Sequence, residues 1–122
     1  MIFVTADSCR SQLERLTQLL ISAFPGSTIY QHKDLCRVPH DVLNHKVDAV
    51  FLEIELDKTN GLGFVQMLRR QKKSLPVFII SQTEDLREEA AKVGVNDYFV
   101  QPVTEQQLRD AIQSVKDKEN AS

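Results

Sequence analysis

The stretch VDAVFLEIEL, residues 47–56, decides the fold of this chain. Its centre, residues 49–54, is almost continuously apolar and contains the first of two nearby acidic residues, Glu53 and Glu55. Continuous apolar runs of this length are typical of strands in parallel sheets, because helices cover both faces of such sheets. The stretch therefore predicts a buried central strand with Glu53 near its carboxyl end.

Four further strands are predicted, at residues 2–4, 28–30, 77–80 and 98–100. Segments with helical spacing of apolar residues separate them. In the first segment Leu13, Leu16 and Leu20 recur at steps of three and four residues. Five strands alternating with five helices predict an α/β fold with a doubly wound, five-stranded parallel sheet, since right-handed crossovers place helices on both faces.

Local signals support two of the predicted helices. Thr104 and Gln107 have the spacing of a capping box before the last helix. Pro39 suits the first turn of the second helix, because a missing amide proton costs nothing at that position. Val42 and Leu43 are the expected buried pair of this second helix.

Composition limits the function classes. The chain has 122 residues and a formal net charge of -2. This length suits one domain, and this charge does not point to a nucleic-acid or membrane partner. Cys9 and Cys36 lack metal-binding spacing and are expected to be reduced thiols of a cytoplasmic protein. We expect a domain over residues 1–117. Residues 118–122 are then a polar tail, in a segment that frays from Lys116, or the start of a linker.

In a doubly wound sheet the functional crevice lies beyond the carboxyl ends of the strands. The residues that end or follow the predicted strands are therefore the candidate site residues. They are Thr5, Ala6, Asp7, Glu53, Glu55, Ser81 and Gln101. The histidines lack the spacing of metal ligands, so no metal site is expected from them.

Three segments resemble the receiver domain of two-component response regulators. Residues 47–61 are similar to the family's third strand and the loop after it. Residues 75–81 resemble the fourth strand, and residues 94–103 resemble the fifth strand with its Lys-Pro corner. The resemblance covers essentially the whole chain. It implies a receiver-like, flavodoxin-like fold of five βα units with strand order 2-1-3-4-5.

The same resemblance assigns a phosphorylation site in which the expected residues are missing. In the family, an aspartate that ends the third strand accepts a phosphoryl group. An acidic pair after the first strand holds magnesium, and a lysine pairs with the phosphate. Here the acceptor position is Glu53, the acidic pair falls at Thr5 and Ala6, and the lysine position is Gln101.

The remaining positions of the resemblance are partly in pattern. Asp7 lies one residue past the acidic pair and, with Glu55, belongs to the degenerate acidic pocket. Ser81 and Tyr98 occupy the positions of the hydroxyl and aromatic switch residues. Pro102 resembles a proline that follows a cis peptide bond, an isomer rare outside such conserved corners.

Phosphotransfer is not expected from these residues. Transfer of a phosphoryl group to a carboxylate requires a divalent cation and a fixed positive charge. Magnesium is usually held through one or two protein carboxylates, which Thr5 and Ala6 do not supply. Gln101 carries no charge, and Glu53 places its carboxylate about 1.5 Å further out than aspartate would, which alone costs rate. We therefore expect magnesium binding to be lost and no cofactor to be used.

Individual residues keep alternative interpretations. Glu53 is a fixed mimic of the phosphorylated state, an idle polar residue at a strand end, or an engineered substitution. Ser81 hydrogen-bonds Glu53 or, as a serine between a strand and a helix commonly does, acts as a helix cap. Tyr98 is a switch aromatic or a half-exposed residue of an edge strand.

The leading functional hypothesis is a pseudo-receiver of phosphorelay signalling that is not an enzyme. It would bind its own output domain, a second copy or a kinase-type partner through the fourth helix, fifth strand and fifth helix. That face would contain Arg87, Lys92, Asp97, Tyr98 and Arg109. The first alternative is a working receiver phosphorylated at Glu53, and the second is a flavodoxin-like enzyme.

Overall fold

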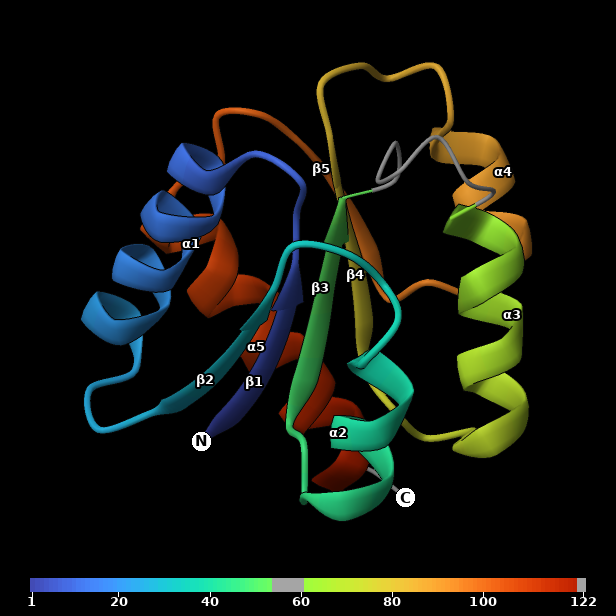
Figure 1. Ribbon diagram of the computed structural model, residues 1–122, viewed down its shortest axis with the longest axis horizontal. Coiled ribbons are helices and arrows are strands. Elements are labelled where there is room, and N and C mark those ends of the chain that lie inside the picture. The colour runs from blue at the N-terminus through green and yellow to red at the C-terminus, as the bar shows by residue number, and fades with distance from the viewer. Residues whose placement is uncertain (54–60, 121–122) are drawn as a thin grey trace.

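The structure is a computed structural model that describes residues 1–53 and 61–120. Strands and helices alternate along the chain as the sequence predicts (Figure 1). The elements are β1 (Ile2–Ala6), α1 (Arg10–Ala23), β2 (Thr28–His32), α2 (Val38–Asn44), β3 (Ala49–Glu53), α3 (Gly61–Gln71), β4 (Val77–Ser81), α4 (Arg87–Lys92), β5 (Asp97–Val100) and α5 (Glu105–Asn120). No helix among the described residues has the length and apolar character needed to cross a membrane.

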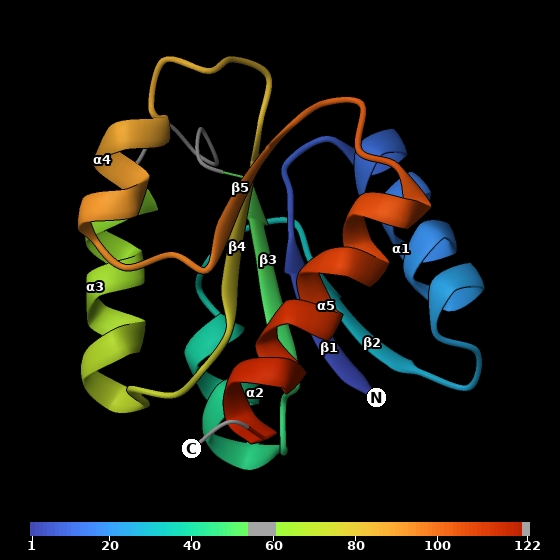
Figure 2. The same cartoon turned by 180° about the vertical axis from the view of Figure 1, so that it is seen from behind.

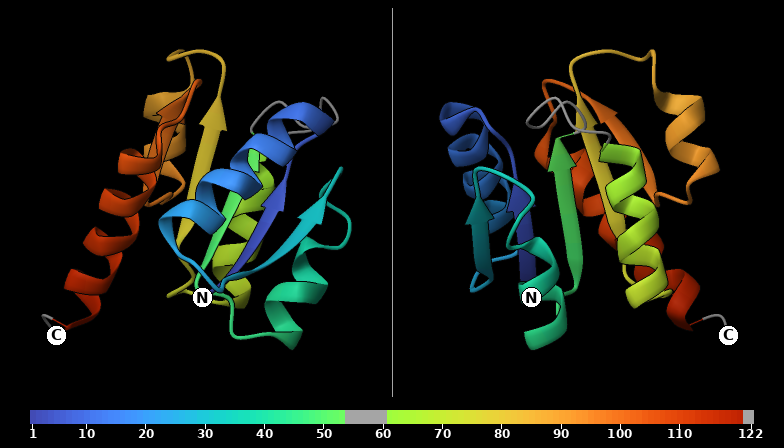
Figure 3. Two further views of the ribbon diagram at one scale, coloured as in Figure 1. Left: turned by 90° about the vertical axis from the view of Figure 1, so that its left-hand side faces the viewer. Right: turned by 45° about the vertical axis from the view of Figure 1, so that its right-hand side comes forward.

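The strands form one parallel sheet in the order β2-β1-β3-β4-β5, which confirms the predicted doubly wound topology. α1 and α5 cover one face of the sheet, and α2, α3 and α4 cover the other (Figures 1 and 2). All strands run in the same direction, so their carboxyl ends share one edge, at the top of Figure 1. The N-terminus lies at the opposite end of the sheet, as Figure 3 also shows.

Each face of the sheet has its own apolar core. Under α1 and α5, aromatic rings form a row across four strands: Phe3, Phe51, Phe78 and Phe99. Their ring centroids are 5.9, 5.1 and 6.0 Å apart in that order. This row fixes which way each strand presents its side chains, because successive residues of a strand point to opposite faces.

The second helix corrects one prediction. Val42 is buried as expected, but Leu43 is 68% exposed. α2 has only seven residues, and its buried positions are Val38, Asp41 and Val42. Asp41 occupies the position that an apolar residue would otherwise fill, because its carboxylate pairs with the ring of His32. Leu43 therefore points away from the sheet.

The last helix confirms its predicted start and extends its predicted end. The amide of Gln107 donates to Thr104 Oγ1 over 3.2 Å, and the amide of Thr104 donates to Gln107 Oε1 over 2.9 Å. This reciprocal pair is the expected capping box. α5 continues to Asn120, so the polar residues from Lys116 that were expected to fray are helical up to that point.

Candidate functional site

The candidate site lies at the carboxyl edge of the sheet, and the pleat divides its residues between the two faces. Glu53 follows Phe51 by two residues and Gln101 follows Phe99 by two, so both are directed to the α1/α5 face. Ser81 follows Ile79, and Tyr98 packs with the core under α2, α3 and α4. Glu53 is 8% exposed and ends the central strand. The predicted site residues thus meet at one edge but in two groups. Glu55 lies outside the described residues.

The acidic-pocket positions assigned to β1 need a correction. β1 continues through Ala6, and Ala6 pairs in register with Leu52 of β3. Thr5 is therefore inside the strand, fully buried, with no hydrogen-bond partner for its hydroxyl oxygen within the described part of the chain. Asp7, expected to be only a remnant, is the first residue past the strand and lies level with Glu53.

Asp7 is a buried carboxylate. It is 5% exposed, and its Oδ1 atom accepts a hydrogen bond of 2.8 Å from the amide of Cys9. Burial raises the pKa of Asp7 above its ordinary value, and the bond from Cys9 opposes that shift less strongly. The residue next to the expected acidic pair is thus a carboxyl group whose pKa is raised by burial.

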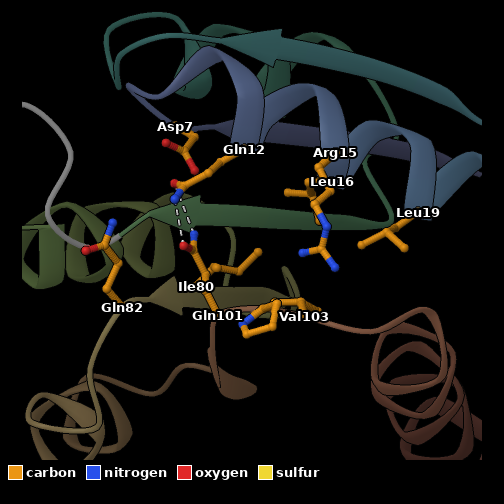
Figure 4. A pocket seen from close by; sticks show the side chains of 10 residues that line it. Asp7, Gln12, Arg15, Leu16, Leu19, Ile80, Gln82, Gln101 and Val103 are labelled. Atoms are coloured by element: carbon orange, nitrogen blue, oxygen red, sulfur yellow. Dashed lines mark hydrogen bonds between the residues drawn. The ribbon is translucent and has the colours of Figure 1, made fainter.

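Gln101, at the family's lysine position, is held by Gln12 of α1. Gln12 Nε2 donates to Gln101 Oε1 over 2.7 Å, and Gln101 Nε2 donates to Gln12 Oε1 over 3.1 Å. The two side chains form a closed amide pair between α1 and the segment after β5 (Figure 4). Sequence reasoning missed Gln12, since nothing local distinguishes it from other polar residues of the helix.

Of the two interpretations of Ser81, the helix cap is wrong. α4 begins at Arg87, whereas Ser81 Oγ accepts a hydrogen bond of 3.2 Å from the amide of Thr83. This short serine turn lies within the connection between β4 and α4. Tyr98 bonds to the same residue, because its hydroxyl donates to the carbonyl oxygen of Thr83.

Tyr98 is not the half-exposed aromatic of an ordinary edge strand. Its side chain is 3% exposed and is turned into the core under α2, α3 and α4. The guanidinium of Arg87 lies over its ring, 4.9 Å from the centroid. The same guanidinium donates to the Tyr98 carbonyl oxygen over 3.0 Å. Tyr98 thus connects the connection after β4, through its hydroxyl, with Arg87 on the surface of α4, through its ring.

The peptide bond between Gln101 and Pro102 is cis, as the resemblance implied. After β5 the chain passes over the sheet edge toward α5 (Figure 2). The hydrogen bonds between Gln101 and Gln12 place this segment beside α1.

The surface of α4, β5 and α5, where the interaction face is predicted, has a hollow of about 370 Å³. Arg87, Asp97 and Tyr98 line this hollow, together with residues of α5. Arg87 is also paired with Glu84, at 2.5 and 2.9 Å, which lowers the pKa of the Glu84 carboxyl. Arg109, expected in the same face, pairs with Glu105 on its own helix at 2.7 Å and does not line the hollow.

Arg69 has a structural function that the sequence did not indicate. Its place in the last turn of α3 is typical of a basic residue that interacts with the helix dipole. Its guanidinium instead donates to the carbonyl oxygens of Lys73, Leu75 and Gly94 and to Oδ1 of Asn96. Oδ1 of Asn96 also accepts the amide of Val77 over 2.9 Å. These bonds join α3 to the segment before β5.

Metal ligation has little support among the described residues. Residues 1–53 and 61–120 contain no group of three or more His, Cys, Asp or Glu side chains that could hold a metal ion. Among the candidate site residues, the described carboxylates are Asp7 and Glu53, and the lysine position offers a neutral amide. This donor set does not match the several oxygen ligands that magnesium prefers.

The fold and the site at the carboxyl ends of the strands define a doubly wound α/β protein of the flavodoxin-like, receiver type. The family model for the response regulator receiver domain matches residues 3–113. The chain therefore belongs to the receiver domain family of two-component signalling.

Known relatives agree with this membership. A chemotaxis protein CheY homolog of Campylobacter jejuni is 30% identical over 96 residues, which are 69% of this chain and 73% of that protein. A probable transcriptional regulator, ycf27, of Cyanidium caldarium is 23% identical over 101 residues, 81% of this chain and 39% of the relative. The chain spans only 29–39% of the first three curated relatives, so in those proteins the receiver region is joined to further chain.

A solved structure supports the fold independently. The response regulator receiver domain protein from Clostridium thermocellum superposes with a TM-score of 0.86 at 20% sequence identity. The match covers 98% of this chain and 97% of the other.

Proposed function

We propose that this chain is a pseudo-receiver that does not accept a phosphoryl group and acts by binding another protein or domain. The observation that carries the proposal is the amide pair between Gln12 and Gln101. The position from which a lysine would contact the phosphate holds a neutral side chain, and both of its polar atoms are already bonded. A phosphoryl group at Glu53 would find no cation there.

The acidic side of the site supports the same proposal. Phosphoryl transfer between two anionic groups depends on a metal ion to offset their charge. Thr5 is buried in β1, and Ala6 has no ligand atom. Asp7 is one carboxyl group whose pKa is raised by burial. Among the described candidate positions, Asp7 is the one carboxyl group beside Glu53, which favours weak magnesium binding.

The interaction surface in this proposal is the face of α4, β5 and α5. Tyr98 is turned inward and lies under Arg87, and its hydroxyl bonds the β4–α4 connection. Since an inward aromatic is the expected partner of an acidic mimic, Glu53 serves as a permanent, single-charge substitute for the phosphorylated state. The partner is an output domain, a second copy of the chain or a kinase-type protein.

Treatment with a small phosphodonor tests the absence of phosphotransfer. The protein is incubated with acetyl phosphate and magnesium, and its intact mass is measured without acid treatment, since acyl phosphates are labile. We expect no adduct. A receiver that retains the acidic pair and the lysine, treated in parallel, shows that the donor is active. A stoichiometric gain of about 80 Da, one phosphoryl group, located at Glu53 would support the working receiver instead.

The substitution Glu53→Gln tests the permanent-mimic part of the proposal. It removes the charge and keeps the shape, so the affinity for a second copy or partner should fall by a few-fold to about a hundredfold. Glu14→Gln is a matched control, because Glu14 is an exposed carboxylate on α1, away from the α4-β5-α5 face. Equal affinities for Glu53→Gln and the unaltered chain would leave Glu53 as an ordinary strand-end residue.

A further inference from the structure

A pocket of about 470 Å³ lies between α1 and the segment that follows β5, next to the sheet edge. Figure 4 shows its lining side chains converging from the two sides. This volume is within the range of pockets that hold small organic molecules, about 300–1,000 Å³. The pocket includes Gln101 but extends beyond the phosphorylation-site positions toward the middle of α1.

The walls of the pocket are apolar. α1 contributes Leu16 and Leu19, and Ile80 of β4 forms the floor. Pro102 and Val103, after the cis bond, form the opposite wall. An apolar body placed between these walls is removed from water on both sides, which is the main source of affinity for a small molecule.

Polar groups are concentrated at two places in this pocket. Asp7 lies beside the Gln12–Gln101 pair at one end, and its buried carboxylate lines the pocket. Arg15 lies further along α1 and extends across the pocket toward the side of Val103 (Figure 4). Within residues 1–53 and 61–120, no hydrogen bond or ion pair engages the guanidinium of Arg15. Arg15 is exposed and Asp7 is buried, so a cation and a carboxyl group lie at separate places along one apolar slot.

We propose that this pocket binds a small amphipathic carboxylate that carries a hydrogen-bond donor, such as an amine, at its other end. The ligand carboxylate would pair with Arg15, whose planar guanidinium is suited to two parallel hydrogen bonds. The apolar body lies between Leu16 and Val103, and the donor reaches Asp7. The pocket shares Asp7 and Gln101 with the phosphorylation-site positions, but ligand binding does not require the proposed loss of phosphotransfer, because neither Glu53 nor a metal takes part.

Charge complementarity is what selects this class of ligand. An uncharged apolar molecule would leave Arg15 without a partner, and a doubly anionic molecule would bring negative charge against Asp7. A zwitterion with its charges at opposite ends satisfies both groups. The bound ligand would also connect α1 with the segment after β5, which the Gln12–Gln101 pair already joins.

Amide spectra of the full chain, followed during titration with 4-(aminomethyl)phenylacetate, test the proposal. This probe has a carboxylate, a ring and an ammonium group in line. We expect saturable shifts confined to the pocket, at residues 7–19, 80–82 and 101–103, and weaker binding of 4-(aminomethyl)phenylacetamide, which lacks the carboxylate. Absence of saturable shifts with the zwitterionic probe at millimolar concentration overturns the proposal, as do shifts centred elsewhere.

Two arginine variants make the test specific. Arg15→Gln should weaken binding of the zwitterionic probe by about ten- to a hundredfold, the loss of a charge-assisted bond. Arg10→Gln is the matched control, because Arg10 is an exposed arginine of the same helix that pairs with Glu14 outside the pocket. It should bind as the unaltered chain does. Equal affinities for Arg15→Gln and Arg10→Gln would overturn the assignment of Arg15.

Discussion

The amide pair between Gln12 and Gln101 should stabilise the fold in a way that neither residue does alone. Its two hydrogen bonds, 2.7 and 3.1 Å long, join residues that are 89 positions apart in the chain, and both side chains are partly buried. A neutral hydrogen bond contributes about 0.5–1.5 kcal/mol net. The two bonds together predict a coupling free energy of about 1–3 kcal/mol between the residues.

A double-mutant cycle measures this coupling. The free energies of unfolding in urea are compared for the unaltered chain, Gln12→Ala, Gln101→Ala and the double variant. Each single variant loses both bonds and leaves one partly buried amide unpaired, so each should cost about as much as the double variant. Their sum should therefore exceed the cost of the double variant by the coupling energy.

An exposed side-chain pair joined by one hydrogen bond from a glutamine amide provides the control. Gln113 Nε2 donates to Asp117 Oδ1 over 2.9 Å on the outer face of α5. Such a pair, four residues apart on a helix, contributes only about 0.2–0.5 kcal/mol. A coupling between Gln12 and Gln101 no larger than that of the control would refute the reasoning. The amide pair would then be incidental, and the main support for the proposed function would be lost.

Three further predictions concern single residues. Since burial raises the pKa of Asp7 above 3.8, the folded chain binds more protons than the unfolded chain just above pH 3.8, and ionisation of Asp7 costs stability as the pH rises. Asp7→Asn should therefore raise the free energy of unfolding at neutral pH and lose this gain below pH 3.8, which urea unfolding at several pH values would check. Tyr98→Phe removes the bond to the Thr83 carbonyl but keeps the ring under Arg87, so calorimetry should show a loss of about 0.5–1.5 kcal/mol. Arg69→Met should cost about 2–4 kcal/mol in the same measurement, whereas Arg70→Met, at an exposed position, should change stability by less than about 0.5 kcal/mol.

The strands and their order could be predicted because their signals are local or topological. Apolar runs identify the central strands, and right-handed crossovers leave few arrangements of five βα units. The limits of β1 and β2 could not be predicted, because Thr5, Gln31 and His32 are polar and end the apolar runs early. In the structure these residues continue the parallel ladder between β1 and β2. Backbone pairing, rather than side-chain hydrophobicity, sets the ends of these strands.

The error at the second helix has a related cause. Spacing alone made Leu43 a core residue beside Val42. The buried position one turn before His45 instead belongs to Asp41, which pairs with His32 of β2. A polar residue enters a core only with a partner, and that partner is nine positions away on another element. Residue patterns within a helix do not contain this information.

The sequence predicted where the candidate site lies, but not which residues its side chains bond. The positions of Glu53, Ser81, Tyr98 and Gln101 followed from the resemblance and from the rule for carboxyl edges. Their partners did not. Gln12 and Thr83 are ordinary polar residues in sequence, and each gains its importance from a contact across the fold.

The hydrogen bonds around Thr83 link the carboxyl edge of the sheet to the α4-β5-α5 face. An edge that does not change would therefore keep that face in one conformation. Its amide is held by Ser81 Oγ, and its carbonyl oxygen is held by the hydroxyl of Tyr98. The first bond ties the β4–α4 connection to the end of β4, and the second ties it to the ring that lies under Arg87. A displacement of this connection would have to break one bond or move the ring, and moving the ring would disturb Arg87 on the α4 surface.

In a switching receiver such a linkage transmits a change, because a new group at the edge alters the bonds of the hydroxyl. Where the acceptor position is a permanent carboxylate, the same linkage instead keeps the α4-β5-α5 face in one arrangement. This linkage therefore supports the proposal that the chain binds its partner constitutively through that face.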